Sequence, residues 1–130
     1  MAGLPARGVI LLVDDDPGVR SVAGRMLREA GYTVIEAADG LQAWTLFHGD
    51  PSRFQAVVAD VVMPRMPGTA LAVRVRGLRP EVPVLLMSAY TGADLRARGL
   101  LAAFGVLLTK PFDAATLIAS IEQALGQQGE

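Results

Sequence analysis

The sequence contains no cysteine. A disulfide framework and a thiolate metal site are therefore both excluded. No apolar run approaches the roughly 20 residues that a membrane-spanning helix needs. The segment from Met1 to Gly8 has proline and arginine but no apolar core, so we expect no signal peptide and no membrane partner. Taken together, these absences make a cytoplasmic protein the default expectation.

Charged and aromatic residues are also sparse. Charged residues make up 19% of the chain, aromatic residues make up 5%, and the formal net charge is -1. A balance this close to neutral gives no electrostatic basis for direct binding of nucleic acid. What the chain does contain is 52% hydrophobic residues over 130 positions, which indicates one globular domain with one core.

Two chemically versatile residues occur once each. His48 is the only histidine, and we expect it to be exposed and without a catalytic duty, because a phosphorylated histidine normally needs a supporting helical bundle that this pattern does not supply. Lys110 is the only lysine among 12 basic residues. Its isolation reflects either chance or a need for a compact ammonium on a flexible stem at that point.

Short apolar runs alternate with amphipathic stretches along the chain. This order predicts a doubly wound five-stranded parallel sheet with helices on both faces. We expect a flexible N-terminus over residues 1–8, one domain over 9–125, and a tail or linker start over 126–130. The predicted strands span residues 9–13, 32–37, 56–60, 82–87 and 104–108, and the predicted helices span about 17–30, 40–49, 69–78, 92–101 and 114–125.

Local signals support several of these helices. Asp16 before Pro17 is typical of a helix start, because the aspartate can accept hydrogen bonds from free amides while proline takes the first helical position. Asp113 is predicted to cap the last helix in the same way. The helical spacing also assigns Val22 and Leu41 to buried faces, and we interpret Trp44 as core packing.

Polar side chains follow the predicted strands where each strand ends. Right-handed crossovers place all strand-to-helix loops at one edge of a parallel sheet. Open α/β sheets bind their ligands at that edge. We therefore expect the following residues to share one crevice: Asp14, Asp15, Asp60, Ser88 and Lys110.

Such a cluster has a definite chemistry. Two carboxylates about 5 Å apart repel by roughly 3 kcal/mol at an effective dielectric constant near 20, so a divalent cation is expected to relieve the crowding. All-oxygen ligands in a wet crevice favour Mg²⁺. Lys110, the Ser88 hydroxyl and the Ala89 amide can then donate to phosphoryl oxygens. One carboxylate is left to attack phosphorus.

A nucleotide-binding interpretation of the same fold fails at the first loop. A dinucleotide or flavin site would offer a glycine-rich, electropositive cradle there. This chain instead has three consecutive aspartates from Asp14 to Asp16. Bare phosphate would be repelled by them, so the site requires metal first.

Four motifs in this order resemble one known family. They are residues 13–17 (VDDDP), 60–68 (DVVMPRMPG), 87–89 (MSA) and 110–112 (KPF). From Val9 to about Leu125 the chain resembles the receiver domain of two-component response regulators, either stand-alone or fused to a hybrid sensor histidine kinase. The resemblance implies a flavodoxin-like (βα)5 fold. It also implies a signalling phosphoacceptor that catalyses only its own phosphorylation and dephosphorylation.

The resemblance assigns roles around the metal and the acceptor. Asp60 would accept a phosphoryl group from a phosphohistidine of a histidine kinase or phosphotransfer protein. Asp15, Asp60 and the Val62 carbonyl would hold Mg²⁺, with Asp14 acting through water. Phosphorylation would then change the surface offered to a downstream protein target or a fused kinase. A phosphorylation-dependent homodimer through the last two helices would leave no mark in the sequence.

The remaining family roles concern the phosphoryl oxygens and the switch. Ser88, the Ala89 amide and Lys110 would contact the phosphoryl oxygens, and the peptide bond from Lys110 to Pro111 would be cis. The resemblance also implies that Ser88, Tyr90 and Leu107 form the region that changes conformation on activation. At the Leu107 position the family usually has an aromatic residue. Ala103-Phe104 replaces the usual Gly-Ala before the last strand, which predicts an unusual surface there.

Two other classes of function are compatible with parts of the pattern. A phosphatase of the haloacid dehalogenase type would use Asp14-x-Asp16, Ser88 and Lys110, although Gly18 stands where that motif has threonine or valine. A pseudo-receiver would keep the fold as a binding module without being phosphorylated. Binding of Mg²⁺ separates the pseudo-receiver from a working receiver, because metal should stabilise only an intact acidic site.

Overall fold

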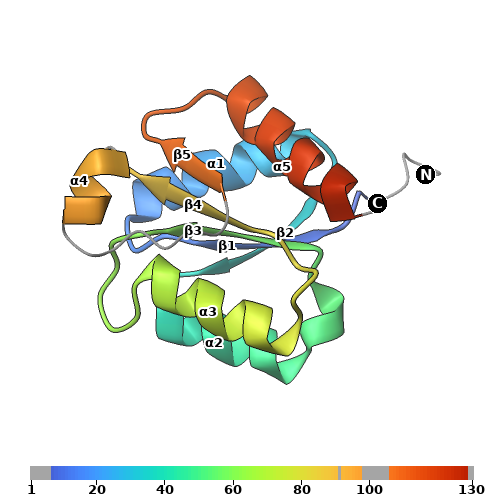
Figure 1. The fold of residues 1–130 in the computed structure, drawn as a ribbon. Coiled ribbons are helices and arrows are strands. Elements are labelled where there is room, and N and C mark those ends of the chain that lie inside the picture. The colour runs from blue at the N-terminus through green and yellow to red at the C-terminus, as the bar shows by residue number, and fades with distance from the viewer. Residues whose placement is uncertain (1–6, 91, 98–105, 129–130) are drawn as a thin grey trace.

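A parallel sheet forms the centre of the fold (Figure 1). The structure, a computed structural model, describes residues 7–90, 92–97 and 106–128. Its five strands lie in the order β2-β1-β3-β4-β5 and all neighbours pair in parallel. The strands are β1 (Val9–Val13), β2 (Thr33–Ala37), β3 (Ala56–Asp60), β4 (Val84–Ser88) and β5 (Val106–Thr109).

Helices cover both faces of this sheet. Figure 1 shows α1 and α5 on one face and α2 and α3 on the other, with the short α4 beside one end. The predicted doubly wound fold is confirmed. Among the described residues, no helix combines the length and the hydropathy that crossing a membrane requires. The helices are α1 (Pro17–Glu29), α2 (Gly40–Gly49), α3 (Gly68–Leu78), α4 (Gly92–Ala97) and α5 (Ala114–Gln128), with a 3-10 turn over Pro51–Arg53.

Alternation along the strands divides the core between the two faces. Leu11 of β1 packs in the cluster that contains Phe47 of α2. Its neighbour Leu12 packs in the other cluster, with Leu27 of α1 and Leu117 of α5. Because both faces are covered by helices, every position of β3 and of β4 is buried. This is why the central strands have almost continuous apolar sequences.

Aspartates cap the helices as predicted from their positions. The Asp16 carboxylate accepts hydrogen bonds from Gly18 N at 2.9 Å and Val19 N at 3.2 Å. The Asp113 carboxylate accepts from Thr116 N at 2.8 Å. Each cap satisfies amide groups that have no partner within the helix. Both predicted caps are confirmed.

The fourth strand is displaced from its predicted position. It runs over Val84–Ser88 rather than 82–87. Pro83 has no N–H to donate to the sheet, and it contributes only its carbonyl, which accepts from Val57 N at 3.0 Å. The displacement makes Ser88 the last residue of the strand.

Both ends of the folded part extend beyond the predicted domain. Arg7 and Gly8, which we placed in a flexible N-terminus, contact the domain: the Gly8 carbonyl accepts from Thr33 N, and the Arg7 guanidinium lies 4.9 Å from the ring centre of Tyr32. At the other end α5 continues to Gln128, so residues 126–128 of the predicted tail are helical. Glutamine is a good helix former, and one glycine costs only about 1 kcal/mol in a helix.

Two apolar residues predicted to be buried are exposed. Val22 is 56% exposed and Leu41 is 49% exposed. The buried stripe of α2 contains Ala43 and Phe47, and Leu41 lies off it because successive helical residues are rotated by about 100°. In α1 the neighbouring Ala23 is buried while Val22 lines a surface groove.

Trp44 and His48 lie where the sequence indicated. The Trp44 ring packs against the core and stacks on Phe47 with their centres 6.4 Å apart. His48 is exposed, with its ring centre 5.3 Å from that of Trp44. The start of the fifth predicted strand, the end of the fourth predicted helix and the Ala103-Phe104 replacement fall outside the described residues.

Gly68 permits a very close backbone approach at the end of β3. Its N–H donates to the Val61 carbonyl at 2.9 Å. A Cβ added at Gly68 would lie 2.2 Å from the backbone oxygen of Asp60. The Asp60 oxygen belongs to the backbone and cannot move aside as a flexible side chain could. Only glycine therefore lets α3 start this close to the strand that carries Asp60.

We expect Gly68→Ala to lower the free energy of unfolding by about 1 to 3 kcal/mol, because overpacking against backbone forces a shift. The matched control is Gly77→Ala in the same helix, where an added Cβ meets no atom within 4 Å. That change should raise the free energy of unfolding by about 0.5 to 1 kcal/mol. Urea unfolding of the three proteins measures both effects, and equal stability of the two variants would contradict the close approach.

Candidate functional site

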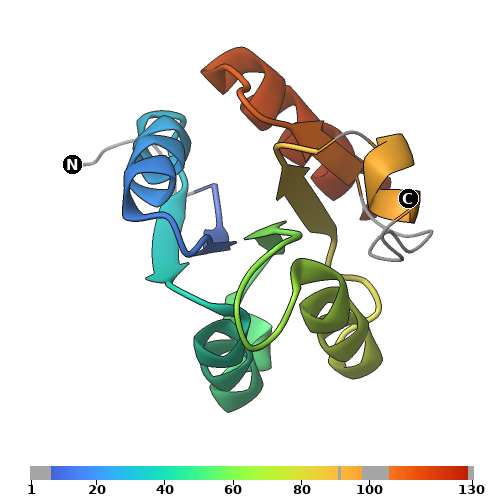
Figure 2. The same cartoon turned by 90° about the vertical axis from the view of Figure 1, so that its left-hand side faces the viewer.

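Three carboxylates meet where β1 and β3 end. Asp14, Asp15 and Asp60 each offer an oxygen, and these oxygens all lie within 4.8 Å of one another. Figure 2 views the fold from this side, where the loop that follows β3 emerges. The predicted acidic cluster is thus present, and it is a set of oxygen ligands that could bind a metal ion.

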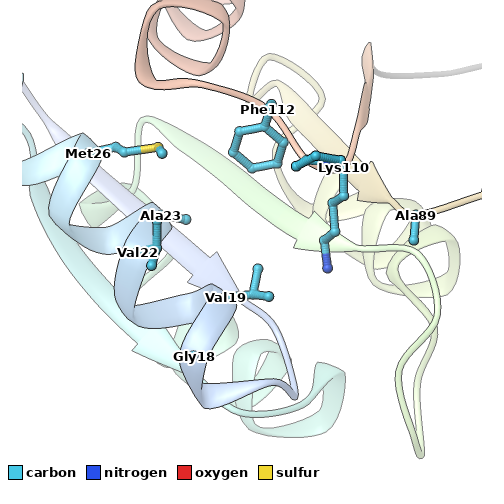
Figure 3. A pocket seen from close by; sticks show the side chains of 9 residues that line it. Gly18, Val19, Val22, Ala23, Met26, Ala89, Lys110 and Phe112 are labelled. Carbon is cyan, nitrogen blue, oxygen red and sulfur yellow. The ribbon is translucent and has the colours of Figure 1, made fainter.

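Lys110 reaches this cluster from the end of β5. Its Nζ lies 2.8 Å from Asp14 Oδ2 and 3.4 Å from Asp60 Oδ2. The backbone N of Lys110 donates to the Ser88 carbonyl at 2.7 Å, which ties the start of the turn to β4. Figure 3 shows the Lys110 side chain extending toward the end of β3. One ammonium therefore bridges two of the three carboxylates.

Burial and charge act in opposite directions on these groups. Desolvation raises the pKa of Asp60, the Lys110 ammonium lowers it, the Asp14 carboxylate raises it, and the net result is a raised pKa. Desolvation would lower the pKa of Lys110, but its hydrogen bond to Asp14 and the charge of Asp60 outweigh that effect and raise it. Lys110 is accordingly charged at neutral pH.

The first loop separates the three consecutive aspartates into different roles. Asp14 is fully buried, and its Oδ1 accepts from Asp16 N at 2.9 Å. Asp15 is exposed. Asp16 points its carboxylate at the amides that open α1, so it acts as a cap and leaves the cluster to its neighbours. This arrangement removes the Asp14-x-Asp16 pair that the phosphatase interpretation needs.

Ser88 and its neighbours form another side of the site. Ser88 is 1% exposed, and its Oγ accepts from Tyr90 N at 2.9 Å. Ala89 lines a groove that Lys110 also lines. The Val62 amide donates a hydrogen bond to the Asp60 carboxylate, while the Val62 side chain is 43% exposed. The residue pattern and the family resemblance together named these residues, and their roles at the site stay predictions.

The switch position and the turn are also described. Leu107 is partly buried and packs against the core face that contains α2 and α3. It pairs with Leu86 across the β4–β5 register. The peptide bond from Lys110 to Pro111 is cis, as the family resemblance implied.

A groove that the sequence analysis missed adjoins the acidic cluster. It has a volume of about 470 Å³ and runs between α1 and the segment after β5. Figure 3 shows Val19, Val22 and Met26 on one wall and Lys110 and Phe112 on the other. Sequence periodicity placed Val22 and Met26 on the buried side of α1. In the structure these two residues instead face the groove, across from Phe112 (Figure 3).

Comparison with known proteins agrees with this geometry. Residues 10–122 match the response regulator receiver domain family. The transcriptional regulatory protein PrrA of Mycobacterium tuberculosis is 36% identical over 120 residues, which are 92% of this chain and 51% of that protein. The sensor kinase CckA of Brucella abortus is 36% identical over 127 residues, which are 96% of this chain and 13% of that protein. The chain spans about half the length of PrrA.

A solved structure shares the fold. The complex of CheX, CheY, BeF3 and Mg²⁺ from Borrelia burgdorferi aligns with a TM-score of 0.80 at 22% identity, covering 91% of this chain and 89% of that one. The fold, the acidic cluster typical of a phosphoacceptor site and the family match agree with one another, and they do not support the phosphatase interpretation. The chain belongs to the response regulator receiver domain family, whose members are signalling phosphoacceptors rather than catalytic enzymes.

Proposed function

We propose that Asp60 accepts a phosphoryl group from the phosphohistidine of a histidine kinase or phosphotransfer protein. The observation that carries the proposal is the position of the Asp60 carboxylate, which lies in the acidic cluster and 3.4 Å from Lys110 Nζ. A carboxylate oxygen forms a bond to phosphorus, the bond from phosphorus to the imidazole nitrogen breaks, and the electron pair leaves with the imidazole. The product is an aspartyl phosphate.

The residues present fit Mg²⁺. Asp15, Asp60 and the Val62 carbonyl would hold it, with Asp14 acting through water. Hard oxygen ligands and an exposed Asp15 suit an ion that keeps several of its waters. When bound, Mg²⁺ supplies positive charge that relieves carboxylate repulsion and stabilises phosphoryl oxygens. The similar complex from Borrelia burgdorferi contains Mg²⁺, which agrees with this choice.

Three donors are proposed to contact a phosphoryl group on Asp60. The Lys110 ammonium already contacts the Asp60 carboxylate and can transfer its hydrogen bonds to phosphoryl oxygens. The Ser88 hydroxyl uses an oxygen lone pair to accept from Tyr90 N, a bond that does not involve the hydroxyl proton. The Ala89 amide is the third proposed donor. All three would orient and stabilise the phosphoryl group.

Phosphorylation would change the surface that the domain presents to other proteins. With Leu107 partly buried in place of the usual aromatic residue, the proposed change is carried by Ser88 and Tyr90 at the end of β4. The proposed recipients are a downstream target, a fused kinase or a second copy in a phosphorylation-dependent homodimer. Because kinases need ATP, the proposed location is the cytoplasm.

The groove beside Lys110 is the proposed contact surface for the phosphohistidine protein. A donor histidine has to reach Asp60, so the surface around it must contact the rim of the acidic crevice. The groove shares Lys110 with that crevice and is lined mainly by apolar side chains. Val22, at 56% exposure, is the apolar residue of α1 most open to a partner.

The phosphoacceptor role is tested by intact mass after incubation with acetyl phosphate and Mg²⁺. The parent should gain one phosphoryl group, because its acidic cluster and Lys110 are in place. Asp60→Asn should gain none, since an amide oxygen is a poor nucleophile toward phosphorus. A parent that stays unmodified with this donor and with phosphohistidine proteins would leave the pseudo-receiver as the better interpretation.

The proposed docking groove makes a separate prediction. Val22→Glu should leave labelling by acetyl phosphate unchanged but slow transfer from a phosphohistidine protein that labels the parent. We expect a reduction of about tenfold or more, because an unpaired charge in an apolar interface costs on the order of 1 to 3 kcal/mol. The matched control is Val73→Glu on α3, where the valine is 59% exposed on the opposite face. Equal transfer to both variants would contradict the groove assignment.

Metal removal tests the acidic cluster itself. Saturating Mg²⁺ should raise the melting temperature of the parent, because the ion binds only the folded cluster. Without metal, Asp60→Asn should increase the free energy of unfolding at neutral pH by about 1 to 3 kcal/mol, since it removes a buried charge beside Asp14. It should also reduce the stabilisation by Mg²⁺.

The raised pKa of Asp60 determines how the stability gained by Asp60→Asn changes with pH. Below the ordinary aspartate pKa of about 4, the carboxyl is protonated in both states and the gain from Asp60→Asn should vanish. The gain should grow as the pH rises from there through the folded-state pKa. Denaturant unfolding in EDTA at acidic and neutral pH measures this. An unchanged melting temperature of the parent at saturating Mg²⁺ would contradict the metal site.

A further inference from the structure

Arg20 links the acidic loop to the neighbouring strand. It lies in the first turns of α1, and its Nη1 donates to the backbone oxygen of Asp14 at 2.7 Å. Its Nε donates to Glu36 Oε1 on β2 at 3.2 Å. The planar guanidinium makes both bonds from fixed directions, which a single ammonium group could not reproduce. Neither bond involves a carboxylate of the acidic cluster.

Glu36 is itself held in place from a second direction. Its Oε2 accepts from Arg28 Nη2 at 2.9 Å, and the same nitrogen lies 3.4 Å from the Val34 carbonyl. In the β1–β2 register Glu36 lies opposite Leu12, and Leu12 is two residues before Asp14. The anchor for Arg20 is therefore a carboxylate fixed by a strand and by another guanidinium.

The bond to the Asp14 oxygen acts on a whole peptide unit. Because a peptide is planar, holding the Asp14 carbonyl also sets the direction of the Asp15 N–H and limits rotation between the two residues. The Asp14 amide is held on the other side, by the Ala37 carbonyl at 3.2 Å. These two contacts fix the backbone from which both carboxylates project.

Another ion pair on the same helix provides a contrast. Arg25 and Glu29 lie 3.3 Å apart with side chains 81% and 69% exposed. Such a pair contributes little, because water screens both charges. Arg20 and Glu36 are only 20% and 32% exposed, and Arg20 alone of these two arginines contacts the acidic loop.

We propose that Arg20 is a positioning residue for the metal site, acting through the peptide between Asp14 and Asp15. This inference rests on the proposed function, since it requires the acidic cluster to bind a divalent cation. Arg20 holds the loop so that the Asp14 and Asp15 carboxylates converge with Asp60 before the ion arrives. An ion then binds to ligands that are already arranged, which favours affinity.

An effect of charge and an effect of positioning predict opposite changes in cation affinity when the Arg20 guanidinium is removed. Arg20 is a cation bonded to the backbone of the acidic loop, so by charge alone its removal should tighten the binding of another cation. If Arg20 positions the loop, its removal should weaken that binding. The direction of the change in affinity therefore separates the two roles.

The probe is Mn²⁺ alone, followed by the electron paramagnetic resonance signal of the free aqueous ion. We expect Arg20→Met to weaken Mn²⁺ binding by about tenfold, the lower end for residues that orient metal ligands. Arg20→Lys keeps the charge but not the two-armed geometry, so it should restore little of the loss. Arg25→Met is the matched control, and its affinity should stay within about twofold of the parent because its ion pair is exposed.

A second variant guards against simple loss of folding. Glu36→Gln keeps an oxygen acceptor for Arg20 and the shape of the side chain, and it should weaken Mn²⁺ binding less than Arg20→Met does. The double variant with Arg20→Met should lose less Mn²⁺ affinity than the two single losses combined, since both residues belong to the same chain of contacts from Glu36 to Asp14. Urea unfolding in EDTA establishes that each variant is folded before metal is added.

The outcomes separate this inference from the proposed function. Unchanged or tighter Mn²⁺ binding by folded Arg20→Met would overturn the positioning role and leave the metal site standing. An equal loss of affinity in Arg25→Met would also overturn it. A parent that binds no Mn²⁺ would overturn the metal site and the inference together, whereas weaker binding confined to Arg20→Met, with little rescue by lysine, would support both.

Discussion

Repulsion among Asp14, Asp15 and Asp60 is the constraint on which the rest of the site depends. The three groups meet within 4.8 Å, and one of them is fully buried. Lys110 offsets part of this repulsion, because its ammonium contacts both Asp14 and Asp60. A cation shared between two carboxylates relieves part of the repulsion and leaves the rest available to favour a divalent ion. The same balance keeps Lys110 charged beside the proposed acceptor.

The scaffold places these charges at the edge of its apolar core, where the strands end. Both faces of the sheet are occupied by apolar side chains under helices, so ionisable groups are left to the edge where the strands end. The chain is also closely packed at that edge. Gly68 lets the backbone of α3 approach the Asp60 carbonyl, and the cap at Asp16 turns the chain into α1 immediately after Asp15. The acidic cluster is thus held by the short segments that join β1 to α1 and β3 to α3.

The surroundings of the cluster divide into two kinds of surface. Toward Glu36, Arg20 joins the acidic loop to a polar network that is partly shielded from water. Toward Phe112, α1 faces a groove whose lining is mainly apolar and which shares Lys110 with the cluster. The first surface suits the support of ligands, and the second suits contact with another protein. Both arise from opposite sides of one helix.

The sequence by itself determined the alternation of strands and helices, the capping aspartates and the set of polar residues at the strand ends. These follow from local rules: hydrophobic runs, turn residues and the handedness of crossovers act over short distances along the chain. Four motifs in family order then identified the receiver domain. The cis peptide after Lys110 was expected from that resemblance alone and is present.

Only the tertiary structure decided which neighbours these elements have. Periodicity could not show that Val22 borders a groove, because that depends on where the β5–α5 segment lies. It could not show that Arg20 contacts Asp14 and Glu36, since the bond to Glu36 joins residues from different elements. Nor could it show that Asp14 is buried while the adjacent Asp15 is exposed. Burial, shared cations and long-range hydrogen bonds are set by packing between elements, and a linear pattern does not contain that information.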